Sequence, residues 1–468
     1  MGGGRLIQFA TVLILADLLA PEDFGLVALG FILINFLVIF RELGLGETLI
    51  QRQHDLDEAY SSALILFPIL GIVLYIVAFL AAPYASIFFH QRDVVPLIRI
   101  MGFSIPIAAL GMLPTTLVRK DLAFRNRLVP ELLFSVGYGV VAIFLALRGY
   151  GAFSMVYGQI VAEALRSLAY WMVCPVRFRW RPSFRVTKEI LGFGQKVTAG
   201  SFSIYVFNNM DQFAIGKLLG DAALGFYSFM FRIANFPAVN ITHVVNQVLL
   251  PVYSMMQGDR ERFRRSYIRA TSMIAAATIP LAIGIVLFGR EGLIAIYGSK
   301  WLPAVAVLQV LAIYGMLRSV GATFGSVLIV SSHPVWLFYG AGCQILAAGI
   351  ALGLGAAKYG IDGVAIVMTT ALIIGVVMTG IKVTTILDLK LTDWIRIIGV
   401  PLLVSVAIFG LLAAILPADS TAWLFAKIVI AALLYLSATY WLYRGEFRLL
   451  FQELRSSVTS SRLDRIDC

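Results

Sequence analysis

The sequence predicts an all-α polytopic membrane protein, with about fourteen transmembrane helices in two parallel, pseudo-symmetric lobes. Three observations lead to this fold class: the composition, the succession of long apolar segments, and an internal repeat. Of the 468 residues, 60% are hydrophobic and 13% are charged, and the mean hydropathy is +0.89. A soluble domain of this composition would have too little polar surface to cover itself. The bilayer is therefore the expected solvent of the chain.

The apolar segments are long enough to be helices that cross a membrane, which needs about 20 residues each. No segment alternates apolar and polar residues as a membrane barrel strand does. Connections such as PED and RGYG permit only a tight reversal between antiparallel helices. The first segment is expected to be an uncleaved helix, because no small-residue cleavage site precedes the PEDFG turn. The predicted spans are residues 6–20, 24–40, 61–88, 94–118, 128–148, 150–173, 197–219, 222–256, 267–289, 302–329, 334–356, 361–384, 397–416 and 421–443.

An internal repeat relates the two halves at an offset of 200 residues. ADLLAPEDFGLVALGFILINF at 16–36 aligns without a gap with GKLLGDAALGFYSFMFRIANF at 216–236. Gly25 matches Gly225 and Asn35 matches Asn235, and hydrophobicity alone does not explain these two matches. Both copies begin on helices of the same direction, so the halves are expected to be parallel.

The repeat and the charge runs divide the chain into five parts. We predict an N-lobe of six helices at 1–175, a basic cytoplasmic linker at 176–196 and a C-lobe of six helices at 197–385. Two further helices follow at 386–443, and a basic cytoplasmic tail at 444–468.

The distribution of the 37 Lys and Arg residues gives the orientation. Most of them fall in segments on one side of the predicted membrane. Basic residues are enriched in cytoplasmic segments, so both termini are expected to be cytoplasmic. The outer segments and outer helix ends hold only Arg92, Arg99, Arg148, Lys217, Arg290, Lys300 and Lys358.

Several chemistries are excluded or disfavoured. The net charge of +11 and the stretch VRFRWRPSFR at 176–185 are better explained by the anionic inner leaflet than by nucleic acid. The three cysteines and four histidines are scattered, so neither a metal site nor a disulfide framework is expected, and no Walker motif is present. No catalytic residues are predicted, and the short outer connections argue against an enzyme acting on lipid-linked sugars.

Ionisable groups inside the spans are the candidate functional residues, because each is expensive in lipid. Arg232 lies near mid-depth and is the strongest candidate for binding an anionic substrate, since a guanidinium pairs with phosphate bidentately. Further substrate-binding candidates are Asn235, Asn35, Arg318, and Arg41 with Arg52 at a cytoplasmic mouth; ordinary membrane anchoring explains Arg41 and Arg52 equally well.

A second group of polar residues bears on coupling. Asp211, beside Asn208, is either the structural counter-ion of Arg232 or a site for a coupling Na⁺ or H⁺. Glu163 is a further coupling candidate, although an ion pair with Arg166 three residues away is the simpler interpretation. No other cofactor is expected.

Several segments resemble one family. LLAPEDFGLVALG, FRELGLGETLIQRQ at 40–53, LVRKDLAFRNRLVPE at 117–131 and GSKWLPAVAVLQVLAIYGMLRSVG at 298–321 resemble polysaccharide exporters of the colanic acid and teichuronic acid type. These exporters belong to the multidrug/oligosaccharidyl-lipid/polysaccharide flippase superfamily.

The resemblance implies two six-helix lobes with two added helices, and alternating access. It also implies transfer of undecaprenyl-pyrophosphate-linked oligosaccharide repeat units across the bacterial inner membrane, for surface polysaccharide synthesis beside a polymerase and export machinery. Two alternatives remain open: a drug or cation antiporter of the same superfamily, using Asp211 or Glu163, and a membrane enzyme that modifies polyprenyl-linked sugars.

Overall fold

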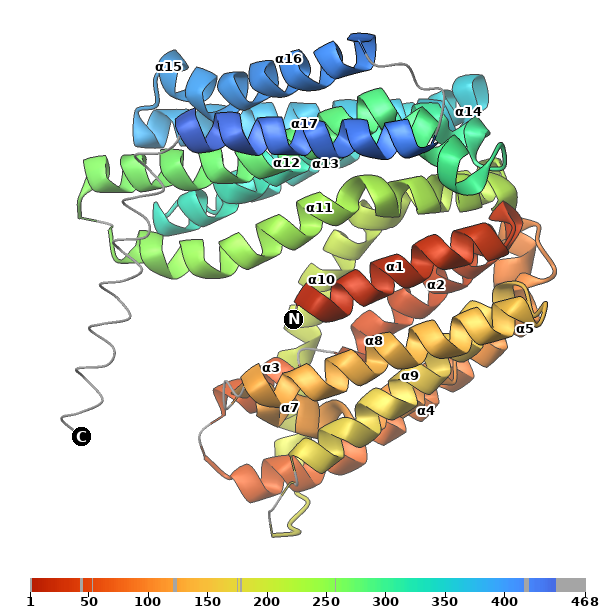
Figure 1. Ribbon diagram of the computed structural model, residues 1–468. Helices are drawn as coiled ribbons and strands as arrows, with labels where there is room; N and C mark the ends of the chain where they lie inside the picture. Colours follow the sequence, from red (N-terminus) through yellow and green to blue (C-terminus); the bar gives the residue numbers. More distant parts are fainter. Residues whose placement is uncertain are drawn as a thin grey trace. The chain divides into compact units, whose positions relative to one another are not determined.

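A computed structural model describes residues 2–42, 45–52, 54–120, 124–174, 176, 179–256, 258–415 and 421–442. Within these ranges the regular structure is entirely helical, as predicted (Figure 1). The chain divides into two compact units, which are described separately here. Unit 1 comprises Met1–Phe229 with Leu352–Val364, and unit 2 comprises Met230–Ala351 with Ala365–Cys468. The five-part division by sequence stays a prediction.

The helices follow the predicted spans closely. Eight helices of the described ranges are long and apolar enough to cross a membrane, or up to nine when a bent pair counts as one span. Unit 1 contains α1 (Gly2–Leu18), α2 (Pro21–Glu42), α3 (Leu45–Gln51), α4 (Leu56–Phe89), α5 (Val94–Met101), α6 (Ser104–Leu110), α7 (Met112–Lys120), α8 (Phe124–Leu147), α9 (Ala152–Val173), α10 (Phe184–Leu218) and the start of α11 (Asp221–Ser254).

Unit 2 holds the rest of α11 and the later helices, except that the middle of α14, Leu352–Val364, belongs to unit 1. These are α12 (Arg260–Tyr297), η1 (Leu302–Ala304), α13 (Val305–Val330), α14 (Val335–Leu387), α15 (Leu391–Trp394), η2 (Ile395–Gly399), α16 (Val400–Ile415) and α17 (Thr421–Leu442). Gly360 interrupts α14 with φ 58° and ψ −137°, a conformation that glycine adopts without strain. The interruption separates the two spans predicted at 334–356 and 361–384.

The span predicted at 94–118 is bent and divided into shorter helices. This segment is three short helices, α5, α6 and α7, and α7 is bent by 48° from the stretch Val94–Leu110. Proline has no N–H, so Pro106 and Pro114 remove helical hydrogen bonds within it. The unpredicted helix α3 lies near the end of α7: Lys120 Nζ donates to the carbonyl oxygens of Leu49 (3.2 Å) and Arg52 (2.8 Å). This contact is favourable, because the C-terminus of a helix such as α3 carries a partial negative charge that attracts the Lys120 ammonium group.

Helix α10 begins at Phe184, within the linker predicted at 176–196. Ser183 caps this helix: its hydroxyl accepts a hydrogen bond from the Val186 N–H. The second half of the predicted linker is therefore helical and continuous with the helix that follows it.

The two copies of the repeat contact each other inside unit 1. The starts of α2 and α11 cross so closely that a Cβ at Gly25 would collide with the Asp221 carbonyl, and a Cβ at Gly225 with the Pro21 carbonyl. Pro21 and Asp221 are themselves equivalent at the offset of 200. The two copies therefore meet through equivalent atoms, as a duplication predicts, and each glycine is required by the other copy's backbone.

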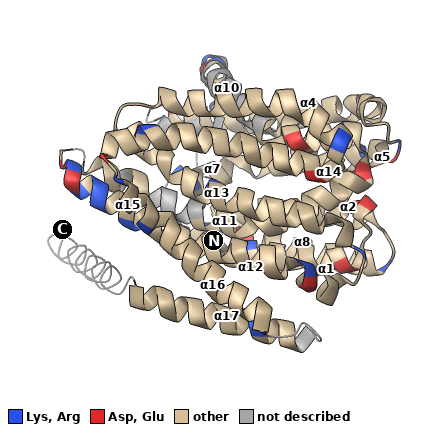
Figure 2. Ribbon diagram, turned by 90° about the horizontal axis from the view of Figure 1, so that it is seen from above, with Lys and Arg blue, Asp and Glu red and all other residues tan. Residues whose placement is uncertain are grey.

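Charged residues are sparse along these helices (Figure 2). A cluster of them lies where the first turns of α12 meet α15 in unit 2, with Arg264 Nη2 2.6 Å from Asp393 Oδ2. Elsewhere the surface carries many large apolar side chains, for example Leu80, Ile350 and Leu403, whose exposed fractions are 63%, 77% and 69%. Such faces require a hydrocarbon environment, so the chain is an integral membrane protein.

Candidate functional site

Unit 1 contains a polar cavity of about 170 Å³ inside an otherwise apolar helix bundle. Its charged lining comes from helices far apart in the sequence: Arg41 on α2, Arg119 on α7, Glu131 on α8 and Arg166 on α9. The remaining lining residues are Gly46, Ala108, Gly111, Met112, Thr115, Thr116, Ser167 and Tyr170. Three guanidinium groups around one small cavity are costly in lipid, which makes the cavity a candidate functional site.

Arg166 is held in place by the ion pair that the sequence favoured. Its Nη2 lies 2.5 Å from Glu163 Oε2, and its guanidinium carbon stacks 4.7 Å from the centre of the Phe134 ring. Glu163 also accepts a hydrogen bond from Gln159 Nε2 at 3.4 Å. Glu163 thus neutralises Arg166, with its side chain 9% exposed.

The lining of the cavity is rich in guanidinium groups. Three arginines line it beside one carboxylate, Glu131, and Arg166 pairs with Glu163. Glu131 accepts a hydrogen bond from the buried Tyr170 hydroxyl at 3.0 Å. In a low-dielectric setting, guanidinium groups gathered in this way attract an anion.

The arginines are the charged hydrogen-bond donors that line this cavity. Thr115 and Thr116 donate their hydroxyl protons to the carbonyls of Gly111 (2.7 Å) and Met112 (2.8 Å). The Ser167 hydroxyl donates to the Ile107 carbonyl at 2.8 Å. A bound anion would therefore be held by guanidinium groups, whose planar forks suit phosphate oxygens.

The two arginines predicted at a cytoplasmic mouth lie in different environments. Arg41 lines the cavity, whereas Arg52 forms an ion pair with Glu189 at 3.1 Å and approaches Asp55 at 3.6 Å. Arg185 reaches the same Asp55 carboxylate at 3.6 Å. Arg52 thus belongs to a charge cluster that ties the end of α3 to the start of α10.

The candidates on α11 and α13 belong to unit 2. Arg232 is exposed and Arg318 is half-buried. Asn235 is 3% exposed; its Nδ2 donates to the Phe231 carbonyl at 3.2 Å, and its Oδ1 has no hydrogen-bond partner. Asn35, its equivalent in unit 1, is exposed. The cavity of unit 1 does not include these residues.

Asp211, the coupling candidate, is 1% exposed within unit 1. Its carboxylate accepts hydrogen bonds from the Tyr227 hydroxyl and the Gln212 N–H, both at 2.8 Å. Neighbouring Asn208 is exposed. Because Asp211 and Arg232 lie in different units, their role as a pair stays a prediction.

Across the part of the chain that the structure describes, no group of three or more His, Cys, Asp or Glu residues could hold a metal ion. Cys174 and Cys343 form no disulfide with each other, and Cys468 lies outside the described residues.

Sequence reasoning missed Arg119, Glu131 and Tyr170 as parts of one site. Arg119 was counted only among the basic residues of the inner segments, and a cation at a helix end looks the same whether it anchors in head groups or lines a cavity. The segment LVRKDLAFRNRLVPE at 117–131 contained both Arg119 and Glu131 and was the available signal.

Curated proteins of polysaccharide biosynthesis are similar to this chain. The teichuronic acid biosynthesis protein TuaB of Bacillus subtilis (strain 168) is 28% identical over 68% of this chain and 66% of its own length. The lipopolysaccharide biosynthesis protein WzxC of Escherichia coli (strain K12) is 24% identical over 68% and 65%. The succinoglycan biosynthesis transport protein ExoT of Rhizobium meliloti (strain 1021) is 27% identical over 76% and 72%. The chain thus spans about two thirds of the length of the first two relatives.

Two solved structures share the fold. An inward closed conformation of the lipid II flippase MurJ superposes with a TM-score of 0.77, over 95% of this chain and 98% of that chain, at 17% identity. An inward-facing multidrug resistance transporter of the MATE family, in the MOP superfamily, gives a TM-score of 0.66 over 83% and 96%, also at 17% identity.

The family model described as polysaccharide biosynthesis protein matches residues 14–306, which is more than half of the sequence. This stretch contains the three cavity arginines and both copies of the repeat. The chain therefore belongs to the polysaccharide biosynthesis protein family.

Proposed function

We propose that this protein is a flippase, and not an enzyme. In this proposal it moves undecaprenyl-pyrophosphate-linked oligosaccharide repeat units from the cytoplasmic to the periplasmic leaflet of the bacterial inner membrane, by alternating access, for surface polysaccharide synthesis. The family, the names of the relatives and the fold shared with a lipid II flippase support it.

The cationic cavity of unit 1 is the observation that carries the proposal. A diphosphate cannot enter hydrocarbon without replacement of its hydration, and Arg41 and Arg119 supply charge and hydrogen-bond donors for it. The cavity's volume of about 170 Å³ is below the roughly 300–1,000 Å³ of sites that enclose drug-sized ligands. It suits the charged group alone, while the bulky glycan stays outside it.

Arg232 provides a further guanidinium for the substrate in this proposal. It is exposed on α11 and lies about ten residues into the span predicted at 222–256. Asn235, one turn further, and Arg318 on α13 are proposed to assist.

Both chain ends are proposed to be cytoplasmic, because basic residues are enriched in the segments on that side of the predicted membrane. A tag at Cys468 should then be digested by protease only in inside-out vesicles.

Coupling to Na⁺ or H⁺ through Asp211 is part of the same proposal. Asp211 is buried and lies within the span predicted at 197–219, where a carboxylate is costly unless it serves a function. Asp211→Asn should make transport insensitive to an imposed cation gradient, while substrate binding persists. Unchanged gradient dependence would leave Glu163 and Asn208 as the coupling candidates.

The proposal is tested by complementation in cells that lack their own copy of the protein. Arg41→Gln and Arg119→Gln should each lower surface polysaccharide at least tenfold at unchanged protein level, because each removes a donor and a charge from the cavity. Arg52→Gln should have a smaller effect, since its partner is Glu189. Arg181→Gln, which removes an exposed cation, is the matched control.

Normal polymer in both cavity variants would reject the cavity as the diphosphate site. Resistance to toxic cations without any effect on polymer would instead favour the antiporter alternative.

A further inference from the structure

The bend between α6 and α7 leaves two backbone carbonyls without their helical donors. The Leu110 carbonyl would accept from residue 114, but Pro114 has no N–H. The Ile107 carbonyl would accept from Gly111, but the Gly111 N–H donates to the Ala109 carbonyl instead. An unpaired carbonyl at membrane depth costs several kcal/mol, so a bend here needs replacement donors.

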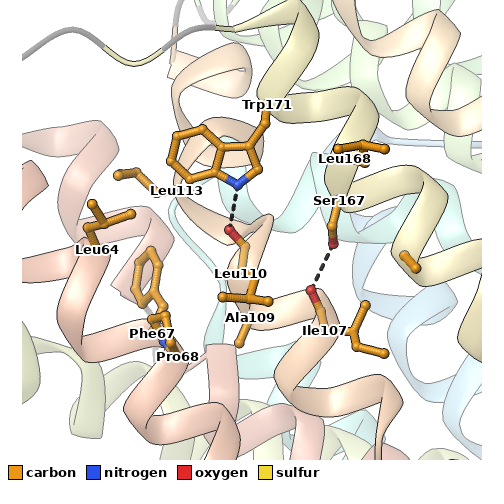
Figure 3. A pocket seen from close by; sticks show the side chains of 11 residues that line it. Leu64, Phe67, Pro68, Ile107, Ala109, Leu110, Leu113, Ser167, Leu168 and Trp171 are labelled. Carbon is orange, nitrogen blue, oxygen red and sulfur yellow. Dashed lines mark hydrogen bonds between the residues drawn. The ribbon is translucent and has the colours of Figure 1, made fainter.

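Helix α9 supplies both donors from adjacent turns (Figure 3). Trp171 Nε1 donates to the Leu110 carbonyl at 2.9 Å, and Ser167 Oγ donates to the Ile107 carbonyl at 2.8 Å. Gly111 permits this close approach, because a Cβ there would lie 2.6 Å from Ser167 Oγ and 2.8 Å from Ser167 Cα. The bend is thus fixed by side chains that lie more than fifty residues further along the chain.

An apolar cavity of about 640 Å³ lies beside the bend, lined from α4, α6, α7 and α9 (Figure 3). Leu64, Phe67 and Pro68 of α4 stand across this space from Leu110 and the Trp171 ring. Further along α7, Leu113 and Leu117 pack in one buried cluster with Phe67. The two hydrogen bonds therefore act at the bend itself, where the cavity leaves space, and add to the packing of α7.

The direction of α7 decides where Arg119 lies. Thr115, Thr116 and Arg119 all reach the cationic cavity from α7, while Arg166, next to Ser167, reaches it from α9. One helix, α9, therefore both contributes a cavity arginine and sets the angle of the helix that carries another.

We propose that Trp171 and Ser167 are positioning residues for Arg119. Their hydrogen bonds to the Leu110 and Ile107 carbonyls hold the α6–α7 bend that places the Arg119 guanidinium on the cationic cavity. The part of this inference that concerns substrate rests on the proposed function; the part that concerns the bend does not.

The bend is tested by cysteine labelling without any substrate. Cys174, Cys343 and Cys468 are first replaced by Ser, and Arg119→Cys is then introduced. The rate at which a charged thiol reagent labels this cysteine is measured in inside-out vesicles. Trp171→Phe keeps an aromatic ring but removes the donor, and Ser167→Ala removes the other. Each should change the labelling rate several-fold, and both together should change it more. Trp441→Phe, at an exposed site on α17, is the matched control.

Labelling rates for Trp171→Phe and Ser167→Ala that equal the Trp441→Phe rate would overturn the inference. This outcome is independent of what the cavity binds.

A double-mutant cycle tests the link to binding, with farnesyl diphosphate as the probe and purified full-length protein. Trp171→Phe and Arg119→Gln should each weaken binding about tenfold, and the double variant should bind no more weakly than Arg119→Gln alone, because a misplaced guanidinium and a missing one are equivalent. A double variant that binds about a hundredfold more weakly than the unaltered protein, which is the product of the two single losses, would contradict the positioning role of Trp171. If Arg119→Gln alone binds normally, the proposed function of the cavity fails, while the labelling rates still decide the role of the bend.

Discussion

The two copies of the repeat, residues 16–36 and 216–236, agree in their glycines and differ in their charge. Gly25 and Gly225 each lie against the other copy's backbone, at the Asp221 and Pro21 carbonyls. Seven residues later the copies diverge: Ile32 is 3% exposed, whereas Arg232 is exposed. The copies retain what the helix crossing requires and are free to differ elsewhere. Structural and functional positions can therefore be separated within one repeat.

The asparagines of the repeat diverge in the opposite sense. Asn235 is buried with an unpaired Oδ1, whereas Asn35 is exposed. The sequence match between the two asparagines does not correspond to a shared environment. A sequence match that lies away from the crossing of α2 and α11, such as Asn35 with Asn235, therefore indicates common ancestry of the two copies but not a common role.

The largest effect is expected at the crossing itself. Gly25→Ala and Gly225→Ala should each destabilise the protein by about 1–3 kcal/mol or more, because the added methyl group would collide with backbone rather than with a movable side chain. Thermal unfolding followed by size-exclusion chromatography in detergent measures this effect.

Gly349→Ala is the control with the opposite sign. A Cβ at Gly349 on α14 meets nothing within 4 Å, so this exchange should stabilise its helix by about 0.5–1 kcal/mol. If Gly225→Ala were as stable as Gly349→Ala, the reciprocal contact between the copies would be wrong.

The second prediction sets Arg232 against its equivalent Ile32. Arg232→Gln should abolish polymer export at unchanged protein level, since the exposed guanidinium is proposed to contact substrate. Ile32→Gln should instead lower the amount of folded protein, because burying an amide without partners costs about 1–3 kcal/mol. Surface polysaccharide is assayed beside membrane protein level. Export that survives Arg232→Gln would remove Arg232 from the substrate path.

The smallest effects are expected at the asparagines. Asn235→Leu removes a buried, unpaired acceptor and should leave stability unchanged or raise it by about 1 kcal/mol. Asn35→Leu at an exposed site should change stability by less than about 0.5 kcal/mol. A loss of export in Asn235→Leu alone, at full stability, would support a substrate contact. Strong destabilisation by Asn235→Leu would mean that its Oδ1 has a partner in the folded protein.

Much of the fold was predictable, because a transmembrane helix is a local feature of about 20 apolar residues. The bend at Gly111 was not. Its prolines are visible in the sequence, but the donors that make it tolerable, Trp171 and Ser167, come from another helix. The site was less predictable still: Arg41 and Arg119 resemble any basic helix ends until folding brings them to one cavity. The pair of Glu163 and Arg166 was predictable, because three residues on one helix fix its geometry.

The central claim is that the cationic cavity of unit 1 receives the diphosphate of a lipid-linked saccharide. The most direct test is leaflet transfer of a fluorescent, short-chain polyprenyl-diphosphate oligosaccharide in vesicles that contain purified protein. Arg119→Gln should slow transfer at least tenfold, while Arg181→Gln transfers at the unaltered rate. Equal rates for Arg119→Gln and the unaltered protein, at equal protein content, would contradict the account.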